Sequence, residues 1–204
     1  MIYLFDIDGV IIHYGSYFSR TLSLQKYENP TKVMDEYFQS TLNCDCDKGK
    51  RDIFEEIKPY LAKMKWYGNP EDYFKSQWNF EKDFIIKEIL NKINKLKNYG
   101  HKVFIASNQN SYRKQFLIQE MQLNTNFNNC FFSCDIGYVK NENEYWEYIE
   151  DYFLKNKIDK EEVLFFDDLF ENVNMAKSHG INSIQINGKQ QVLDFLENEI
   201  KKMA

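Results

Sequence analysis

Two carboxylates near the N-terminus are the residues best suited to chemistry. Asp6 and Asp8 follow an apolar run at residues 2–5 and precede Gly9. A short run with β-branched and aromatic members, stopped by a glycine, is typical of a buried strand. Because side chains alternate along a strand, two acids one residue apart leave it on the same side and can converge on one ligand. Such a pair repels unless a cation or a proton shares the site.

Polar residues able to hold a phosphate or a metal ion also follow three later apolar segments. They are Ser107 with Asn108, Lys140, and Asp167 with Asp168. Taken singly, a serine can be a helix N-cap, a lysine a solvated surface residue and an acid pair a turn. In the order acid pair, serine, lysine, acid pair, each at an expected strand end, they favour one shared site. Ligands of open parallel sheets bind beyond the carboxyl ends of the strands.

The elements that would position these residues alternate from residue 84 onward. Helices are expected at 84–98, 112–121, 144–154, 172–178 and from 190, and strands at 102–106, 131–133, 163–166 and 183–186. Alternating helices and strands favour right-handed crossovers and a mostly parallel sheet. The N-terminal strand, expected at 2–8, belongs to the same sheet. The predicted fold class is therefore α/β, a Rossmann-like sheet flanked by helices.

Between the first strand and residue 84 the sequence is polar, with scattered aromatic residues and no convincing strand. Helical periodicity predicts helices at 31–41, 50–64 and 71–80. We expect this insert to form a small α-helical cap over the strand ends. The chain then divides into a core at 1–14 and 84–204 and a cap at 15–83.

The residues at 6–10, Asp-Ile-Asp-Gly-Val, resemble the first motif of the haloacid dehalogenase-like (HAD) superfamily of phosphotransferases. The order of the motifs matches that superfamily over residues 1–13 and 84–190. The stretch 165–176 resembles the fourth motif of the subfamily whose helical cap is inserted after the first strand. Within it, the chain is most similar to the small hexose-1-phosphate phosphatase-like members. Asn141 departs from the pattern, because a proline is usual there.

This resemblance implies that Asp6 is the nucleophile that attacks phosphorus and forms an aspartyl-phosphate. Asp8 would protonate the leaving oxygen and then activate water, so its pKa would lie near the working pH. Members that resemble dehalogenases lack an acid at this position, since a halide leaves without a proton. Asp8 therefore favours phosphoryl chemistry over carbon–halogen chemistry.

The resemblance also implies how the site is divided between metal and phosphate. Mg²⁺ would be held by Asp6, the backbone carbonyl of Asp8, Asp167 and Asp168. The phosphoryl group would be held by Gly9, Ser107, Asn108 and Lys140, with Ser107 and Lys140 completing the catalytic set. Mg²⁺ would offset the repulsion between these carboxylates and an incoming phosphate dianion.

Two groups of residues in the insert are candidates for contact with the leaving group. One is the loop at 43–51, whose basic residues are Lys48, Lys50 and Arg51. These residues can instead form a solvated turn before a helix. The other group contains Trp66 and Trp78, which can stack on a sugar or a base, or form the core of the cap.

The composition is that of a folded globular protein, with 43% hydrophobic and 17% aromatic residues. The net charge is −5 and acids and bases are interspersed, which gives no reason to expect nucleic acid or an anionic membrane as a partner. No apolar run approaches the length of a membrane span, and the N-terminus lacks a signal-peptide pattern. The four cysteines form no paired framework, so reduced thiols in a cytoplasmic protein are expected.

The motifs and the resemblance that they carry predict a Mg²⁺-dependent phosphatase, monomeric or homodimeric, that acts on a small phosphorylated metabolite such as a sugar phosphate. One alternative is a phosphomutase with the same aspartyl-phosphate, in which the substrate recovers the phosphoryl group before water attacks. Another is a non-catalytic phospho-ligand-binding protein or a phosphorylatable receiver-like switch. The long insert argues against the switch, and Asp8 argues against both.

Overall fold

Five parallel strands form the central sheet of the computed structural model, which describes residues 1–203. They are β1 (Ile2–Phe5), β2 (Lys102–Ser107), β3 (Asn129–Phe132), β4 (Val163–Asp167) and β5 (Asn182–Gln185). Their order across the sheet is β3-β2-β1-β4-β5, and each neighbouring pair is parallel. The expected α/β class and its parallel sheet are confirmed.

The register of the sheet aligns two of the acids. Phe5, the last residue of β1, pairs with Ile105 of β2 and with Phe166 of β4. The backbone N–H of Asp6 then donates to the Phe166 carbonyl at 2.9 Å. Asp6 therefore leaves the sheet level with Asp167, the last residue of β4. Since β1 is paired on both sides, the backbone before Asp6 is held from two directions.

The first strand is shorter than expected. It ends at Phe5 instead of residue 8, because Ile7 begins a turn in which its carbonyl accepts from the N–H groups of Ile11 and Ile12 at 2.8 and 2.9 Å. Asp6 and Asp8 therefore lie beyond the strand, where Asp8 can turn away from the sheet.

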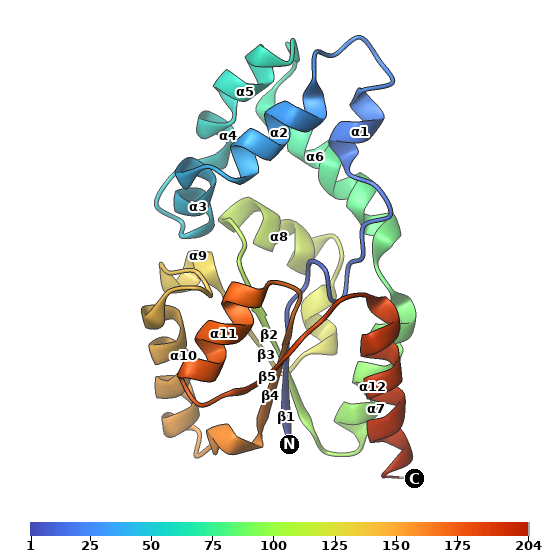
Figure 1. Ribbon diagram of the computed structural model, residues 1–204, viewed down its shortest axis with the longest axis vertical. Helices are drawn as coiled ribbons and strands as arrows, with labels where there is room; N and C mark the ends of the chain where they lie inside the picture. Colours follow the sequence, from blue (N-terminus) through green and yellow to red (C-terminus); the bar gives the residue numbers. More distant parts are fainter. Residues whose placement is uncertain (204) are drawn as a thin grey trace.

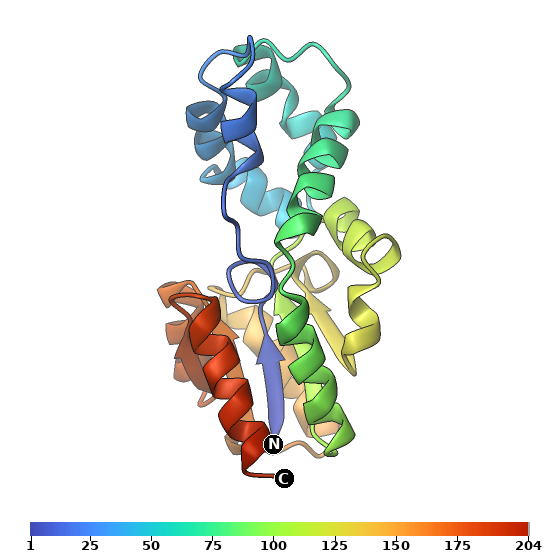
Figure 2. The ribbon, with the colours of Figure 1, turned by 90° about the vertical axis from the view of Figure 1, so that its right-hand side faces the viewer.

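Helices cover both faces of the sheet (Figure 1 and Figure 2). The core helices are α7 (Lys87–Asn98), α8 (Ser111–Gln119), α9 (Ser133–Ile136), α10 (Asn143–Lys155), α11 (Phe170–Ser178) and α12 (Lys189–Lys201), with 3₁₀ turns η1 (Lys82–Phe84), η2 (Leu123–Asn126) and η3 (Lys160–Glu162). α7 and α12 pack side by side with Tyr3 and Phe5, whereas α10 and α11 pack with Leu4 and Phe165. Both faces of β1 are thus buried, which explains its continuous apolar run. No helix formed by residues 1–203 is both long and apolar enough to cross a membrane.

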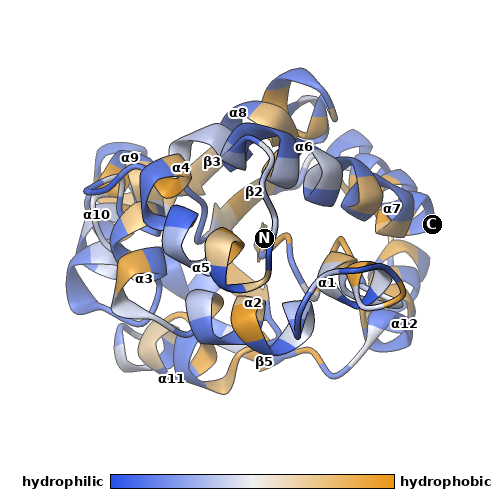
Figure 3. Cartoon of the chain, turned by 90° about the horizontal axis from the view of Figure 1, so that it is seen from above, coloured by the Kyte–Doolittle hydropathy of each residue, from blue (hydrophilic) through white to orange (hydrophobic). Residues whose placement is uncertain are grey.

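Six helices between β1 and η1 form what we term the helical insert. They are α1 (Phe18–Leu22), α2 (Pro30–Phe38), α3 (Thr41–Asp47), α4 (Ile53–Glu56), α5 (Lys58–Lys63) and α6 (Pro70–Glu81). The insert has a hydrophobic core in which Met34, Tyr37 and Tyr73 are buried, and Phe116 of α8 also packs into it. It lies beyond the carboxyl ends of the strands in both side views, and it overlies the core in the view from above (Figure 3).

Two neighbouring chain segments join the insert to the core. The N–H of His13 donates to the Phe84 carbonyl at 3.2 Å, and the N–H of Ile86 donates to the Ile11 carbonyl at 3.0 Å. The segment that leaves the core and the segment that returns are therefore hydrogen-bonded to each other at the base of the insert.

The insert differs from the sequence-based expectation in three places, the first being α1, where no helix was expected. The helix expected at 50–64 is split into α4 and α5, because Pro59 has no N–H and is tolerated only in the first turn of a helix. The loop expected at 43–51 is helical up to Asp47, where α3 ends. Only Cys46 of α3 is buried, so its sequence shows no apolar period.

Candidate active site

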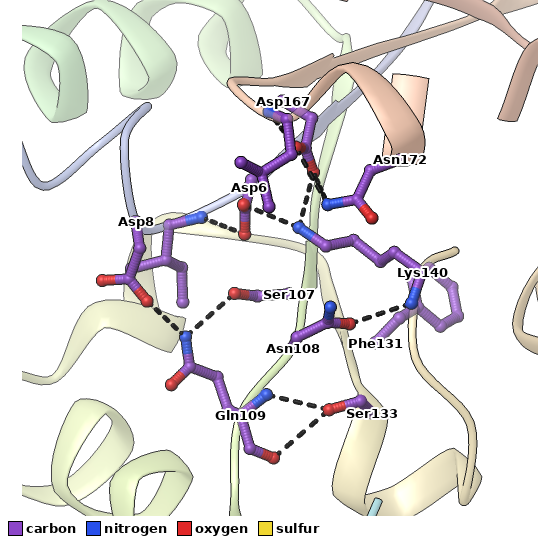
Figure 4. Close-up of polar contacts among 12 residues, drawn as sticks. Asp6, Asp8, Ser107, Asn108, Gln109, Phe131, Ser133, Lys140, Asp167 and Asn172 are labelled. Carbon is purple, nitrogen blue, oxygen red and sulfur yellow. Dashed lines mark hydrogen bonds and ion pairs between the residues drawn. The ribbon is translucent and has the colours of Figure 1, made fainter. Parts of the chain in front are cut away.

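The charged residues expected at the strand ends converge beyond the carboxyl edge of the sheet (Figure 4). Lys140, in the segment between α9 and α10, places its Nζ 2.6 Å from Asp6 Oδ2 and 2.5 Å from Asp167 Oδ2. All three side chains are buried, and none of these residues is more than 5% exposed. The ends of β1 and β4 and the segment before α10 therefore form one buried ionic cluster.

Burial and mutual attraction set the protonation of this cluster. Burial alone would lower the pKa of Lys140, but the carboxylates of Asp167 and Asp6 raise it above its ordinary value. Burial raises the pKa of Asp6 to about 8, although Lys140 favours its charged form. Additional positive charge beside these carboxylates would therefore be favoured.

A third carboxylate completes a set of oxygen ligands. Oxygen atoms of Asp6, Asp167 and Asp168 all lie within 4.8 Å of one another. Asp168 is half-buried, and burial together with the charge of Asp167 raises its pKa to about 6. A set made only of carboxylate oxygens fits a hard divalent cation such as Mg²⁺ better than a soft metal. These three residues therefore fit the expected metal.

Gly9 lies so close to Asp168 that no side chain fits between them. Its φ is +78°, in the left-handed region, and a Cβ built on it would lie 2.3 Å from Asp168 Cγ. Glycine adopts this conformation without strain, so it lets the turn after β1 approach the end of β4. Its N–H donates to the Ile12 carbonyl at 2.8 Å, so this donor is already used in the present conformation.

Asp167 is fixed by the first turn of α11. Asn172 Nδ2 donates to Asp167 Oδ1 at 3.0 Å, and the Leu169 N–H donates to the same oxygen at 2.8 Å. The other oxygen, Oδ2, then faces Lys140. Sequence reasoning gave Asn172 no role, although an amide five residues after Asp167, on the next helix, was a usable signal.

Asp8 turns away from the ionic cluster toward a different set of partners (Figure 4). Gln109 Nε2 donates to Asp8 Oδ2 at 2.7 Å and to Ser107 Oγ at 3.0 Å. Arg113 Nη2 donates to Asp8 Oδ1 at 3.2 Å, and the Tyr14 hydroxyl donates to the same oxygen. Three donors therefore hold the Asp8 carboxylate, and sequence reasoning identified none of them.

Arg113 also connects the core to the helical insert. Its Nη1 donates to Glu81, at the end of α6, and both residues are buried. This ion pair joins residues 32 positions apart, so no local spacing reveals it. The available signal was an arginine in a helix that also buries Phe116 and Leu117.

A cavity of about 560 Å³, which we term the core cavity, brings the predicted site residues together. Its walls include Asp6, Asp8, Gly9, Ser107, Asn108, Lys140 and Asp168. Asp167 is the one predicted residue that does not line it, because it is fully buried behind Lys140. Asn108 Oδ1 accepts from the Lys140 N–H at 2.9 Å, which positions the segment that carries the lysine.

A second cavity of about 500 Å³, which we term the insert cavity, lies between the helical insert and the core. It shares Asp8 and Tyr14 with the core cavity, so the two meet at Asp8. Trp78 lines the insert cavity, whereas Trp66 packs against Tyr27 within the insert. The two tryptophans thus have different surroundings.

Lys48 and Arg51 of the 43–51 segment pair with acids that line neither cavity. Lys48 pairs with Glu142 at 2.5 Å, and Arg51 pairs with Asp45 at 3.2 Å. Neither of these residues nor Lys50 lines the core cavity or the insert cavity. The same segment instead contributes Asn43 and Asp47 to the insert cavity.

The sequence as a whole matches a known family. The family model of haloacid dehalogenase-like hydrolases matches residues 1–180. Because this match covers most of the chain, the protein belongs to the haloacid dehalogenase-like hydrolase family. A search of curated proteins finds no match.

Solved structures share this fold at low sequence identity. A HAD-like family hydrolase from Porphyromonas gingivalis is 18% identical, with a TM-score of 0.73 over 97% of each chain. A HAD family enzyme from Bacteroides thetaiotaomicron is 18% identical, with a TM-score of 0.71 over 90% of this chain and 91% of the other. The L-2-haloacid dehalogenase of Xanthobacter autotrophicus is 16% identical, with a TM-score of 0.62 over 90% of this chain and 76% of the other. These likenesses establish the fold.

Proposed function

We propose that this protein is a Mg²⁺-dependent phosphatase that hydrolyses a small phosphorylated metabolite through an aspartyl-phosphate on Asp6. The observation that carries the proposal is the core cavity. Its walls combine Asp6 with a second acid, Asp8, a hydroxyl on Ser107, a buried ammonium on Lys140 and a further carboxylate on Asp168. Phosphoryl transfer requires this combination of a nucleophile, an acid and positive charge.

Asp6, Asp168 and the backbone carbonyl of Asp8 are the proposed ligands of Mg²⁺, with Asp167 as a ligand or a support. The Bacteroides thetaiotaomicron enzyme has been crystallised with magnesium and inorganic phosphate, which supports Mg²⁺ as the ion. When bound, the ion neutralises part of the negative charge that carboxylates and phosphate bring together.

Four side chains then carry out the steps of the proposed reaction. Asp6 attacks phosphorus in line with the leaving oxygen, which Asp8 protonates. The Ser107 hydroxyl and the Lys140 ammonium hold phosphoryl oxygens. Asp8, now ionised, takes a proton from the water that attacks the aspartyl-phosphate, so one difficult displacement becomes two easier ones.

Asp8 favours a phosphate ester over a carbon–halogen bond as the substrate. An alkoxide leaving group needs a proton, and a halide does not. The three donors around Asp8 hold its carboxylate at the junction of the two cavities, where a leaving oxygen would emerge. The likeness to the Xanthobacter autotrophicus dehalogenase therefore extends to the fold and not to the reaction that we propose.

We further propose that residues 15–83 act as a cap on the core formed by 1–14 and 84–204. A cap inserted after the first strand is the arrangement of the subfamily that the motifs resemble, and its hydrogen-bonded base would serve as the hinge. Closure would exclude water from the core cavity. Sugar phosphates are the first substrates to assay, because of the resemblance to hexose-1-phosphate phosphatases.

Phosphate release from a panel of sugar phosphates, nucleotides and an aryl phosphate tests the proposal, with Mg²⁺ and with a chelator. We expect Mg²⁺-dependent turnover that is lost in Asp6→Asn and kept in Asp194→Asn, an exposed residue of α12. Formation of an isomeric sugar phosphate before free phosphate would indicate a phosphomutase. Phosphate binding without turnover on any compound would indicate a binding protein.

A further inference from the structure

The insert cavity begins where the leaving group would be released. It shares Asp8, Tyr14 and Asp47 with the core cavity. If the phosphoryl group lies against Asp6 and Asp8 protonates the leaving oxygen, the rest of the substrate extends into the insert cavity. The walls of this cavity therefore determine which alcohol is released.

Negative charge exceeds positive charge on these walls. The acids are Asp8, Asp35, Asp47 and Glu81, and the single base is Arg113. Arg113 is already paired with Glu81 and Asp8. Asp35 and Asp47 form no ion pair with any of residues 1–203. A neutral or anionic leaving group would bring no positive charge to Asp47, which is half-buried, whereas Asp35 is exposed and solvated.

Asp47 is held in place by contacts to the core and to its own helix. Ser133 Oγ, at the start of α9, donates to the Asp47 carbonyl at 2.6 Å, and Asn43 Nδ2 donates to Asp47 Oδ2 at 3.2 Å. The neighbouring bases Lys48 and Arg51 pair with acids outside the cavity. The segment nearest the junction of the two cavities therefore presents a carboxylate to the substrate and not a cation.

Aromatic rings form much of the remaining wall. Phe18, Phe38, Tyr73, Phe74 and Trp78 all line the insert cavity. The faces of aromatic rings carry partial negative charge and attract cations, and aromatic walls recognise quaternary ammonium groups. Rings and carboxylates together provide the surroundings that an ammonium group prefers.

Tyr73 adds an independent sign that a polar ligand binds here. The residue is fully buried, and its hydroxyl has no hydrogen-bond partner among residues 1–203. A buried hydroxyl without a partner is unfavourable, so few remain in native proteins. Because Tyr73 lines the insert cavity, the N–H of a protonated amine would supply the missing partner, whereas a quaternary ammonium group has no N–H and would not.

We propose that the insert cavity selects phosphate esters whose leaving alcohol carries a positive charge, either a protonated amine or a quaternary ammonium group. This inference rests on the proposed phosphatase function and specifies its substrate class. The reaction remains a hydrolysis: the bond between phosphorus and the alcohol oxygen breaks, water supplies a hydroxyl to phosphorus, and the alcohol gains a proton. The phosphate is bound in the core cavity, and the cation lies among the aromatic rings and Asp47.

A matched pair of substrates isolates the charge. Choline phosphate and 3,3-dimethylbutyl phosphate have nearly the same shape, but only the first carries a quaternary ammonium. We expect kcat/KM to be about tenfold or more higher for choline phosphate, the factor that a cation–aromatic contact of ordinary strength supplies. Glucosamine 6-phosphate and glucose 6-phosphate form a second pair, in which the amino sugar should be preferred. Equal values in both pairs would overturn the inference.

Variants on α3 locate the effect. Asp47→Asn should reduce the preference for choline phosphate about tenfold, whereas Asp45→Asn, which alters an acid paired with Arg51, should keep it. An unchanged preference in Asp47→Asn would overturn the role of this carboxylate, and with it the inference.

Two further measurements separate this inference from the phosphatase proposal. Suppose that the protein hydrolyses an aryl phosphate, that Asp6→Asn abolishes this activity, and that neither matched pair shows a preference. The phosphatase proposal would then hold, and the cation site would be overturned. Calorimetric titration with choline and with 3,3-dimethylbutanol measures binding affinity in the insert cavity independently of catalysis. Tighter binding of choline, weakened by Asp47→Asn, would support the cation site even if no phosphate ester were hydrolysed.

Discussion

Arg113 of α8 and Glu81 of α6 form a buried ion pair that ties the helical insert to the core, and the same guanidinium donates to Asp8. Arg113→Met would leave two carboxylates without their shared cation. Removing one partner of a buried pair typically lowers the free energy of unfolding by about 3–5 kcal/mol. We expect a loss of this size in urea denaturation.

Arg51→Met is the matched control for that measurement. Arg51 also pairs with two acids, Asp45 and Glu56, but its side chain is 47% exposed. Exposed pairs contribute about 0–1 kcal/mol, so a small loss is expected. Similar losses in the two variants would show that the Arg113 pair does not hold the insert.

Gln109 is expected to act by positioning Asp8. Gln109→Leu removes the amide that donates to Asp8 Oδ2 and Ser107 Oγ. Since general acid catalysis contributes about 10²–10⁴-fold, we expect kcat for alkyl phosphates to fall about tenfold or more. An aryl phosphate, whose leaving group needs less protonation, should be affected much less. Equal losses on both classes would argue against positioning of the acid, and Gln115→Leu, at an exposed site on α8, is the control.

The contact between Gly9 and Asp168 predicts a selective loss of Mg²⁺ binding. Gly9→Ala would place a methyl group on the Asp168 carboxylate and displace it. Gly100→Ala is a matched control, because its φ of +86° gives a similar backbone strain while no atom lies within 4 Å of the added methyl. We expect Mg²⁺ to raise the thermal midpoint of the native protein and of Gly100→Ala, but not of Gly9→Ala. A full Mg²⁺ response in Gly9→Ala would contradict the proposed ligand set.

Asp47 should make stability depend on pH. Burial raises the pKa of its carboxyl to about 7 in the folded protein, against about 4 in an unfolded chain. The folded form thus holds the proton more tightly, so the contribution of Asp47 is neutral below about pH 4 and grows unfavourable up to about pH 7. Asp47→Asn should therefore be more stable than the native protein at pH 8 and equally stable at pH 4 in urea denaturation. The same difference at both pH values would contradict this assignment.

The core of the site could be predicted because it depends on local features of the sequence. Asp6 and Asp167 each follow an apolar run that forms a strand, and a parallel sheet brings strand ends together. Lys140 lies farther from its strand, yet the order of the motifs was enough to include it. The fold follows from the same alternation of helices and strands.

The contacts between the insert and the core could not be predicted from local features of the sequence. Arg113 and Glu81 meet only because two helices pack together, and nothing in either local sequence specifies the other residue. Tyr14 and Gln109 were also missed as hydrogen-bond donors to Asp8. The path of a loop brings each of them to Asp8, and local sequence patterns do not predict that path. The basic segment was a candidate for contact with the leaving group, but its Lys48 pairs with Glu142 instead. Glu142 comes from another part of the chain, so the local sequence does not reveal this pair.

The central position of β1 has a consequence for how the chain folds. Ile2 of β1 pairs with Lys102 and Val163, so both neighbouring strands of β1 are synthesised after it. Closing such long loops slows folding, and an apolar strand that has not yet paired with its neighbours is prone to aggregate. Apart from Phe116 of α8, the buried residues of the helical insert's core all come from the insert, so most of that core can pack before β1 has a partner. The proposed active site is then completed late in translation, when β4 and the residue after it bring Asp167 and Asp168 to Asp6.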